Sequence, residues 1–372
     1  MKNKIKVGLI SLLCFILLIP TVPLKLISAD DTTGANQSTD TSENINQDEF
    51  ASKVDSLLTQ KDFSGTILAV KDGKVVYETS RGYSDFGKGR MNVDNTTYEI
   101  DSIQKSLTAA MIMKQVEKGK LSLNDKLHKF YPAIPGSKKI TIRQMLDMKS
   151  GLVMTNQIGP SAVMSDDHIL KNDIKKLHFS ELYYNRWYYS PVNFNLLSGI
   201  LEKTTGKSYR YMFTKTYIDK LDLKHTIFAY DKSPQIEKAA GYSNVDPLSP
   251  KADYHRAFKT NSYFTYDELG TGQVYMSALD LYKAEHYIVA GNLLSKKSKD
   301  ELFKAGSSSS YGGGFYNGHN NKFANGWGYG FQTVAHISDD GNNSVIVLEN
   351  YQRLAADIKP TASQIFSMLN NN

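Results

Sequence analysis

The sequence predicts a mixed α/β (α+β) domain in which strands from both ends of the folded chain form one sheet, with a mainly helical segment inserted between them. The segment from Leu121 to Leu302 carries mostly helical periodicity broken by turns. β-prone runs stand on either side of it, at 65–70, 75–79, 328–337 and 344–350. Asp-Gly steps between the runs of each pair favour two hairpins.

Helices are expected at both ends of this domain and within its middle. A first helix is indicated by apolar residues spaced for one face: Phe50, Val54, Leu57 and Leu58. Asp101 has the side chain of a good N-cap for a helix that begins at Ser102 and ends near Gly119. Similar periodicity predicts further helices at 194–203, 278–290 and 356–369.

The N-terminal residues are expected to lie outside this domain. Three lysines precede an apolar run from Val7 to Ile19, which is typical of an export signal and short for a membrane span. Ile27 stands where a cleavage site prefers a small residue, so residues 1–29 are either a cleaved signal or a retained membrane anchor. Residues 30–47 are polar and predict a disordered linker, which leaves 48–372 as the folded domain.

Composition limits the classes of protein to which the chain can belong. Of its 372 residues, 41% are hydrophobic and 22% are charged, as in a globular protein. The net charge is +6, but residues 1–29 hold four lysines and no acid, so the remainder has 40 basic and 38 acidic residues. This balance predicts no nucleic-acid partner. Cys14, the only cysteine, lies in the apolar run, so no disulfide is expected and a bacterial surface is favoured.

Ser102 is the only serine followed by a lysine three positions later, at Lys105. At a helix start this spacing places both side chains on one face, about one turn apart. The helix N-terminus favours negative charge on the serine oxygen, and a buried lysine can lose its proton and act as a base. The pair is therefore a candidate nucleophile and base. An exposed serine and lysine on an amphipathic helix would have the same spacing.

Two further stretches carry candidate site residues. Tyr189 and Ser190 come just before a predicted helix, where a tyrosine can share a proton with a serine and its lysine. Asn325, Gly326 and Trp327 belong to a glycine-rich strand that a substrate can approach closely, with a backbone N–H available to an oxyanion. The alternatives are aromatic loop packing and a bulged edge strand. The same choice, between a substrate groove and loop packing, is open for four aromatic residues: Tyr183, Tyr184, Trp187 and Trp327.

Taken in this order, the three motifs resemble those of the serine β-lactamase and penicillin-binding-protein-like family. The resemblance covers roughly residues 50–369 and includes collinear stretches at 115–124, 140–152, 201–209, 221–226 and 270–281. It implies a β-lactamase/transpeptidase-like fold, with an antiparallel sheet flanked by helices and an all-helical subdomain. It also implies an acyl-enzyme formed on serine.

The resemblance assigns roles to the candidate residues. Ser102 is implied to be the nucleophile, Lys105 its base partner and Tyr189 the tyrosine of the second motif. The oxyanion N–H groups are implied to come from Ser102 and Trp327. The residues beside these are candidate substrate contacts: Ser190, Asn325 and Gly326.

Two departures from the family pattern bear on the substrate. Pro191 stands where the second motif usually has Asn, and Ala324 stands where the third motif usually has Lys or His. A cation at the latter place commonly binds a substrate carboxylate, and losing such a charge-assisted bond costs ~1.5–3 kcal/mol. The pattern is therefore more similar to the esterases of this family that remove D-alanine esters from teichoic acids. This implies a cell-wall polymer as substrate. It also implies that the protein acts at the extracellular face of the cell membrane or in the cell wall, or is secreted.

Two rival functions are open. A D,D-carboxypeptidase or β-lactamase would need another cation, with Lys322 and Arg353 as candidates. A non-catalytic envelope-binding or sensor protein would keep only the fold. No metal or other cofactor is expected, because the eight histidines show no His-Glu-x-x-His or similar spacing and there is no glycine-rich phosphate loop.

Overall fold

The computed structural model describes residues 47–154, 162–258, 264–304, 306 and 309–370. The expected export signal lies outside the described residues, as does all of the expected linker except Gln47.

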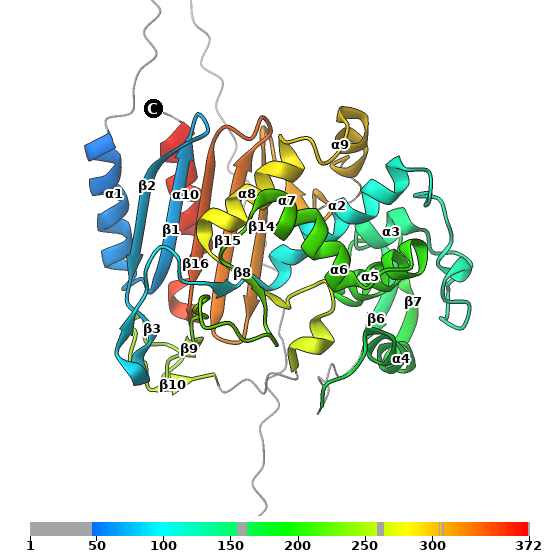
Figure 1. Ribbon diagram of the computed structural model, residues 1–372, viewed down its shortest axis with the longest axis horizontal. Coiled ribbons are helices and arrows are strands. Elements are labelled where there is room, and N and C mark those ends of the chain that lie inside the picture. Colours follow the sequence, from blue (N-terminus) through cyan, green and yellow to red (C-terminus); the bar gives the residue numbers. More distant parts are fainter. Residues whose placement is uncertain (1–46, 155–161, 259–263, 305, 307–308, 371–372) are drawn as a thin grey trace, which may run out of the picture. The chain divides into compact units, whose positions relative to one another are not determined.

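A seven-stranded antiparallel sheet forms the centre of the fold (Figure 1). Its strand order is β12-β13-β14-β15-β16-β1-β2. The strands are β1 (Gly65–Lys71), β2 (Lys74–Arg81), β12 (Tyr311–Gly312), β13 (Phe315–Asn317), β14 (Asn321–Gly328), β15 (Phe331–Ser338) and β16 (Ser344–Glu349). Strand β1 pairs with β16 from Gly65 opposite Glu349 to Val70 opposite Ser344. Strands from both ends of the folded chain therefore join in one sheet, as the sequence predicts.

Both predicted hairpins are present, but the glycine-rich run differs from the prediction. β1 and β2 meet at Asp72-Gly73, and β15 and β16 are joined through 339–343. The strand expected at 328–337 begins only at Phe331, because Tyr329 and Gly330 both have positive φ and turn the chain. The residues before this turn form a separate strand, β14. It is not an edge strand, since β13 lies beyond it.

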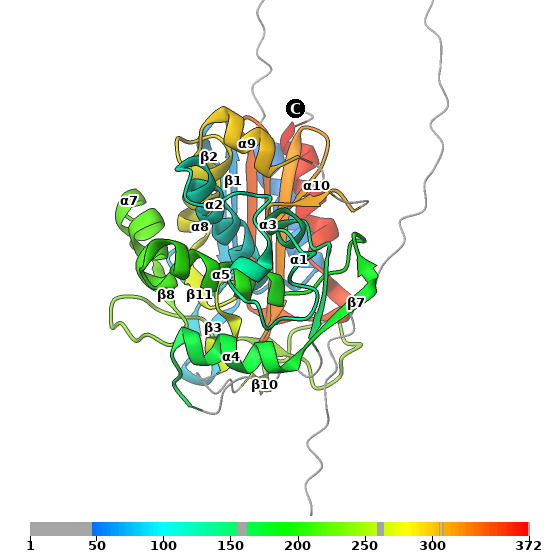
Figure 2. The same ribbon diagram turned by 90° about the vertical axis from the view of Figure 1, so that its right-hand side faces the viewer.

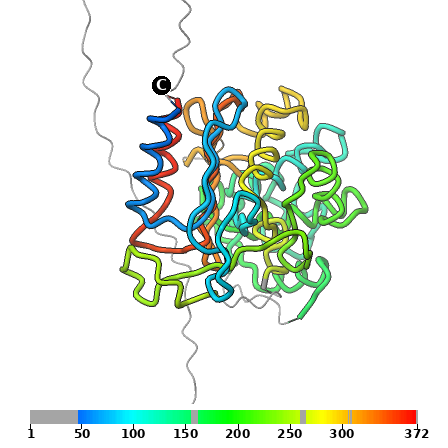
Figure 3. The backbone as a smooth tube through the Cα atoms, turned by 60° about the vertical axis from the view of Figure 1, so that its left-hand side comes forward, coloured from blue at the N-terminus to red at the C-terminus, as the bar shows by residue number. Residues whose placement is uncertain are grey.

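Helices cover both faces of the sheet. On one face α1 (Gln47–Gln60) and α10 (Lys359–Asn370) run side by side, as the blue and red helices of Figure 3 show. Phe50 and Val54 of α1 pack with Ile365 of α10 over the apolar face of β1 and β16. The other face carries α2 (Gln104–Glu117) and α8 (Ala278–Val289). Burying each large apolar side chain contributes roughly 1.5–3 kcal/mol, so each helix is held by its apolar face.

The predicted helical segment lies beside the sheet, with α2 between the two (Figures 1 and 2). Its helices are α3 (Ile142–Leu146), α4 (Asp166–Lys176), α5 (Val192–Thr205), α6 (Tyr209–Phe213) and α7 (Asp219–Leu221), with α9 (Lys296–Leu302) near the sheet. It also contains a two-stranded sheet of β6 (Ser150–Met154) and β7 (Leu177–Tyr184). The remaining strands are β3 (Tyr83–Asp85), β4 (Arg90–Met91), β5 (Tyr98–Glu99), β8 (Thr226–Phe228), β9 (Tyr242–Ser243), β10 (Arg256–Ala257), β11 (Val274–Met276) and β17 (Tyr351–Gln352).

Candidate active site

The candidate nucleophile lies in a tight turn between β5 and α2. Residues Asp101–Ile103 form a short 3-10 turn, and the α-helix begins only at Gln104. The expectation that Asp101 caps this helix is wrong. Asp101 has a φ of 45°, the residue that flanks the turn is Ile100, and no side chain caps it. The positive φ turns the Asp101 carboxylate away from the N–H groups of the turn and toward β14.

Ser102 and Lys105 are brought together as the sequence predicts. The Lys105 Nζ lies 2.7 Å from the Ser102 Oγ and donates a longer bond, of 3.4 Å, to the carbonyl oxygen of Thr271. Lys105 is only 1% exposed. Burial lowers its pKa from the ordinary 10.5 to about 8, because the charged ammonium loses its hydration. A lysine with this pKa is partly neutral near neutral pH and can take the serine proton.

Two carboxylates work against this lowering of the lysine pKa. Glu268 and Asp101 both favour the protonated ammonium of Lys105, yet the burial effect is larger. The pKa of Lys105 is therefore set by a balance between burial and nearby negative charge.

Tyr189 is also part of this cluster. The Lys105 Nζ lies 5.4 Å from the centre of the Tyr189 ring. The ring packs edge-on against Tyr311 of β12, with ring centres 6.4 Å apart. The tyrosine of the second motif thus borders the candidate base, although it comes from a loop more than eighty positions away in the sequence.

Strand β14 lies directly against the turn that carries Ser102. A Cβ added to Gly326 would stand 2.4 Å from the Ile100 carbonyl oxygen and 2.8 Å from the Asp101 Cβ. A Cβ on Gly328 would stand 2.8 Å from Asp101 Oδ1. Only glycine permits so close an approach, which explains the glycine-rich motif. Along the same strand Asn325 and Trp327 are half-buried, whereas Ala324 is buried.

The second motif is completed by groups that are already engaged. Ser190 is buried, and its backbone N–H points to the Met148 sulfur at 3.4 Å. Pro191 flanks the first turn of α5. The buried Asn193 donates from its side-chain amide to the Ser190 carbonyl oxygen at 2.9 Å. Asn193 therefore does not replace the amide that Pro191 lacks.

The aromatic residues near this motif pack against one another. Tyr183 stacks on Tyr188 with ring centres 4.1 Å apart, and Tyr184 packs against Phe179 at 5.6 Å. Trp187 is half-buried against the core. Of the two interpretations that the sequence leaves open, loop packing describes Tyr183, Tyr184 and Trp187 better.

Neither alternative cation replaces the charge missing at Ala324. Lys322 is buried, forms an ion pair with Asp339 at 2.5 Å and lies over the Phe303 ring. Arg353 forms a fully buried ion pair with Glu349 at 2.7 Å. The proposal that one of them serves the site is wrong, because both are held by other partners.

Sequence reasoning missed an acidic cluster beside the nucleophile. The cluster consists of Glu99, Asp101 and Glu268. Burial raises the pKa of Asp101 well above its usual value, and the charges of Glu99 and Glu268 raise it further. Burial likewise raises the pKa of Glu99 to about 8. The Glu268 side chain accepts from Thr271 Oγ1 at 2.8 Å and lies 3.4 Å from the Tyr329 hydroxyl. The sequence held one indication of this cluster, since Glu268 comes two residues before the 270–281 stretch that resembles the family.

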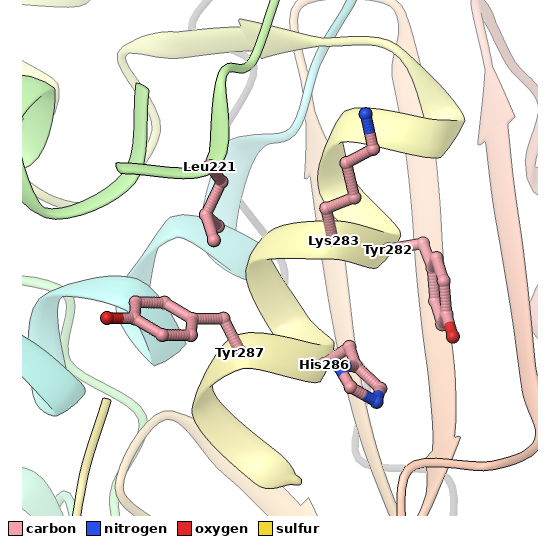
Figure 4. A pocket seen from close by; sticks show the side chains of 5 residues that line it. All are labelled: Leu221, Tyr282, Lys283, His286 and Tyr287. Atoms are coloured by element: carbon pink, nitrogen blue, oxygen red, sulfur yellow. The ribbon is translucent and has the colours of Figure 1, made fainter. Parts of the chain in front are cut away.

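A shallow hollow of about 200 Å³ lies elsewhere, on α8 (Figure 4). Its walls are Leu221, Tyr282, Lys283, His286 and Tyr287, and none of the candidate site residues lines it. In the part of the chain that the structure describes, no three His, Cys, Asp or Glu side chains are placed to hold a metal ion. No described helix has the length and apolar character needed to cross a membrane.

Comparison with known proteins finds similar sequences over most of this chain. Residues 50–359 match the family model described as Beta-lactamase. The chain is 29% identical to the penicillin-binding protein PbpX of Bacillus subtilis, over 86% of this chain and 78% of that protein. It is 28% identical to the teichoic acid D-alanine hydrolase of Staphylococcus aureus, over 83% and 78% of the two chains.

A solved structure has the same fold. The crystal structure of FmtA from Staphylococcus aureus superposes with a TM-score of 0.76 and 25% sequence identity, covering 87% of both chains. The β-lactamase-like fold implied by the sequence motifs is confirmed.

Proposed function

The chain belongs to the beta-lactamase family, whose fold and serine-hydrolase chemistry it shares, and from this premise we propose that it is a cell-envelope esterase that removes D-alanine esters from teichoic acid. The observation that carries the chemistry is the 2.7 Å contact between the Ser102 Oγ and the buried amine of Lys105. The substrate is inferred from the groups around this pair and from the teichoic acid D-alanine hydrolase relative.

The proposed reaction proceeds in two stages. Ser102 Oγ attacks the ester carbonyl carbon, and its proton passes to the neutral amine of Lys105, with Tyr189 bordering the path. The N–H groups of Ser102 and Trp327 hold the oxyanion. The proton then goes to the leaving alcohol oxygen, the ester C–O bond breaks, and D-alanine remains esterified to Ser102. Water, deprotonated by the same lysine, attacks this ester. The ester bond to Ser102 Oγ breaks, Lys105 returns the proton to that oxygen, and D-alanine is released.

The surroundings of Ser102 favour an ester without a free carboxylate. Peptidoglycan peptides and β-lactams present a carboxylate that a cation commonly binds in this family. Here Ala324 offers no charge, and Lys322 and Arg353 are paired elsewhere. Apart from Lys105, the nearby ionisable groups are the acids Glu99, Asp101 and Glu268, which disfavour a substrate carboxylate. A D-alanyl ester brings an ammonium group.

The test is the release of D-alanine from D-alanylated lipoteichoic acid by the full-length protein in detergent, beside a Ser102→Ala control. We expect D-alanine release that is lost in the control. A folded protein that cleaves an activated ester but releases no D-alanine would overturn the substrate. Covalent labelling by penicillin with turnover of D-Ala-D-Ala peptides would favour the carboxypeptidase. Failure of any activated ester to acylate Ser102 would favour a binding protein.

A further inference from the structure

Asp101, the residue before the nucleophile, has two energetically unfavourable features. It is a non-glycine residue with φ of 45°, and it is only 5% exposed. Its Oδ2 atom is buried and has no hydrogen-bond partner in the part of the chain that the structure describes. A buried carboxylate without a partner is unfavourable, and such features concentrate where a protein binds a ligand. The position of Asp101 therefore calls for a partner that the protein itself does not provide.

A second carboxylate approaches the same place from a different segment. A Cβ added to Gly272 would stand 3.2 Å from Glu268 Oε2 and 3.3 Å from the Asp101 Cα, so both acidic residues border this glycine. On the β14 side, Asp101 Oδ1 lies against Gly328. The Glu268 carboxylate and the Asp101 backbone thus both lie near Gly272, and the Asp101 carboxylate faces Gly328 of β14.

No basic side chain neutralises this pair. Among the described residues, no lysine or arginine forms an ion pair with Asp101 or Glu268. The neighbouring cation, Lys105, donates its hydrogen bonds to Ser102 and Thr271. Glu99 lies behind them, accepting a bond from the Tyr275 hydroxyl at 3.1 Å. When Lys105 is neutral, as the base requires, these acids have no cationic partner among the described residues, and a cationic substrate group can supply one.

We propose that Asp101 and Glu268 form the subsite that binds the α-ammonium group of the acyl part of the substrate, and so select an aminoacyl ester over an uncharged acyl ester. The inference rests on the proposed esterase function and names the residues that read its substrate. The α-ammonium is attached to the carbon next to the carbonyl that Ser102 attacks, so its partner must stand beside the nucleophile. Asp101 meets this requirement because it is the adjacent residue.

The ammonium and the two acids stabilise each other. Burial and the charges of Glu99 and Glu268 raise the pKa of Asp101, so its ionised form is unfavourable in the free protein. A bound ammonium offsets both effects and supplies the donor that Oδ2 lacks. A substrate with a carboxylate near this place would meet repulsion instead.

The experiment compares two glycerol esters on the full-length protein: D-alanylglycerol and isobutyrylglycerol, in which a methyl group replaces the ammonium. The measured quantity is the ratio of the two kcat/KM values. We expect the wild type to prefer the D-alanyl ester, and Asp101→Asn to lower the ratio at least about tenfold, as for loss of a charge-assisted bond. Asparagine tolerates positive φ, so this variant is expected to fold. Glu268→Gln should lower the ratio in the same direction.

Glu285→Gln is the matched control. Glu285 is also a buried carboxyl with an oxygen that lacks a partner, but it lies on α8 and bonds Ser106. Its substitution should leave the ratio unchanged. If Asp101 only tuned the Lys105 base, the rates on both esters would change by the same factor in Asp101→Asn and the ratio would stay constant, which would overturn the subsite. If the folded wild type cleaved neither ester, the esterase function itself would fail, and the subsite with it.

Discussion

Arg353 and Lys105 are two of the cations buried in the described part of the protein, and they have opposite kinds of partner. Arg353, which is 2% exposed, forms an ion pair with Glu349 at 2.7 Å and donates to the carbonyl oxygens of Pro250 and Asp62. Lys105, which is 1% exposed, forms no ion pair among the described residues, and its hydrogen bonds go to a hydroxyl and a carbonyl oxygen. Arg353 thus has a carboxylate partner, whereas Lys105 has no carboxylate in contact.

The difference distinguishes Arg353, a cation that stabilises the fold, from Lys105, a lysine that can act as a base. A guanidinium stays protonated, so Arg353 can be buried only with a carboxylate beside it. A lysine can lose its proton, and without a carboxylate in contact burial lowers the pKa of Lys105 to about 8. The missing ion pair is what makes Lys105 available as a base. Asp101 and Glu268 act on it from a distance and keep its pKa from falling further.

The largest expected effect comes from removing the unpaired cation. Lys105→Met should lower kcat/KM for an activated ester by about 10²–10⁴-fold, the usual contribution of a general base. Thermal stability should hold or rise, because a buried ammonium without an ion pair is costly. Steady-state kinetics and thermal unfolding measure both. Lys114→Met on the same helix is the control and should retain activity. Retained activity in Lys105→Met, or a large loss of its stability, would contradict the contrast between Lys105 as a base and Arg353 as a stabilising cation.

Removing the paired cation should have the opposite result. Arg353→Met leaves Glu349 buried without its cation and should lower the free energy of unfolding by about 3–5 kcal/mol, measured by denaturant unfolding. The activity of the folded fraction should not change. The double variant Arg353→Met/Glu349→Gln should recover much of the loss. A change below about 1 kcal/mol in the single variant would mean that the buried pair is not needed.

The pH dependence of catalysis is a finer test. Because the neutral amine is the active form, kcat/KM should rise with pH and level off above about 8, the pKa of Lys105. Asp101 and Glu268 raise this pKa, so Asp101→Asn and Glu268→Gln should move the midpoint to lower pH. Rate profiles on isobutyrylglycerol, which has no ammonium to bind, measure this shift. A midpoint that moves upward would contradict the assigned balance.

The smallest effect concerns the control carboxyl Glu285. Burial raises its pKa from 4.5 to about 8. The folded protein therefore holds this proton more tightly than the unfolded chain, and the resulting stability is present below pH 4.5 and lost as pH rises through about 8. Glu285→Gln lacks this loss, so its melting temperature should fall less than that of the wild type between pH 5 and pH 8. Parallel declines would show that Glu285 is not the group responsible.

The parts that were predictable from the sequence are local. Ser102 and Lys105 are one helical turn apart, so their contact follows from spacing alone. The hairpins follow from their turn residues, and Gly326 indicates close backbone approach. The cap role of Asp101 was predicted wrongly, because cap statistics describe a helix start and carry no information about β14, which packs against it.

The long-range part of the site was not predictable in this way. Glu268 reaches Asp101 across more than 160 positions, and no local pattern reports which charges a fold brings together. Lys322 binds Asp339, which is 17 positions away. Arg353 binds Glu349, which is four positions away, but the spacing does not reveal that both side chains are buried. Burial and pairing, which decide whether a cation is structural or catalytic, belong to the tertiary structure.

The most direct test of the central claim is the trapping of the acyl-enzyme. The full-length protein is mixed with D-alanylated lipoteichoic acid, quenched in acid and digested, and the peptide that carries Ser102 is examined by mass spectrometry. The account predicts one D-alanyl group esterified to Ser102, with none in Ser102→Ala and a strongly reduced amount in Lys105→Met. A D-alanyl group on another residue, or D-alanine release that persists in Ser102→Ala, would contradict it.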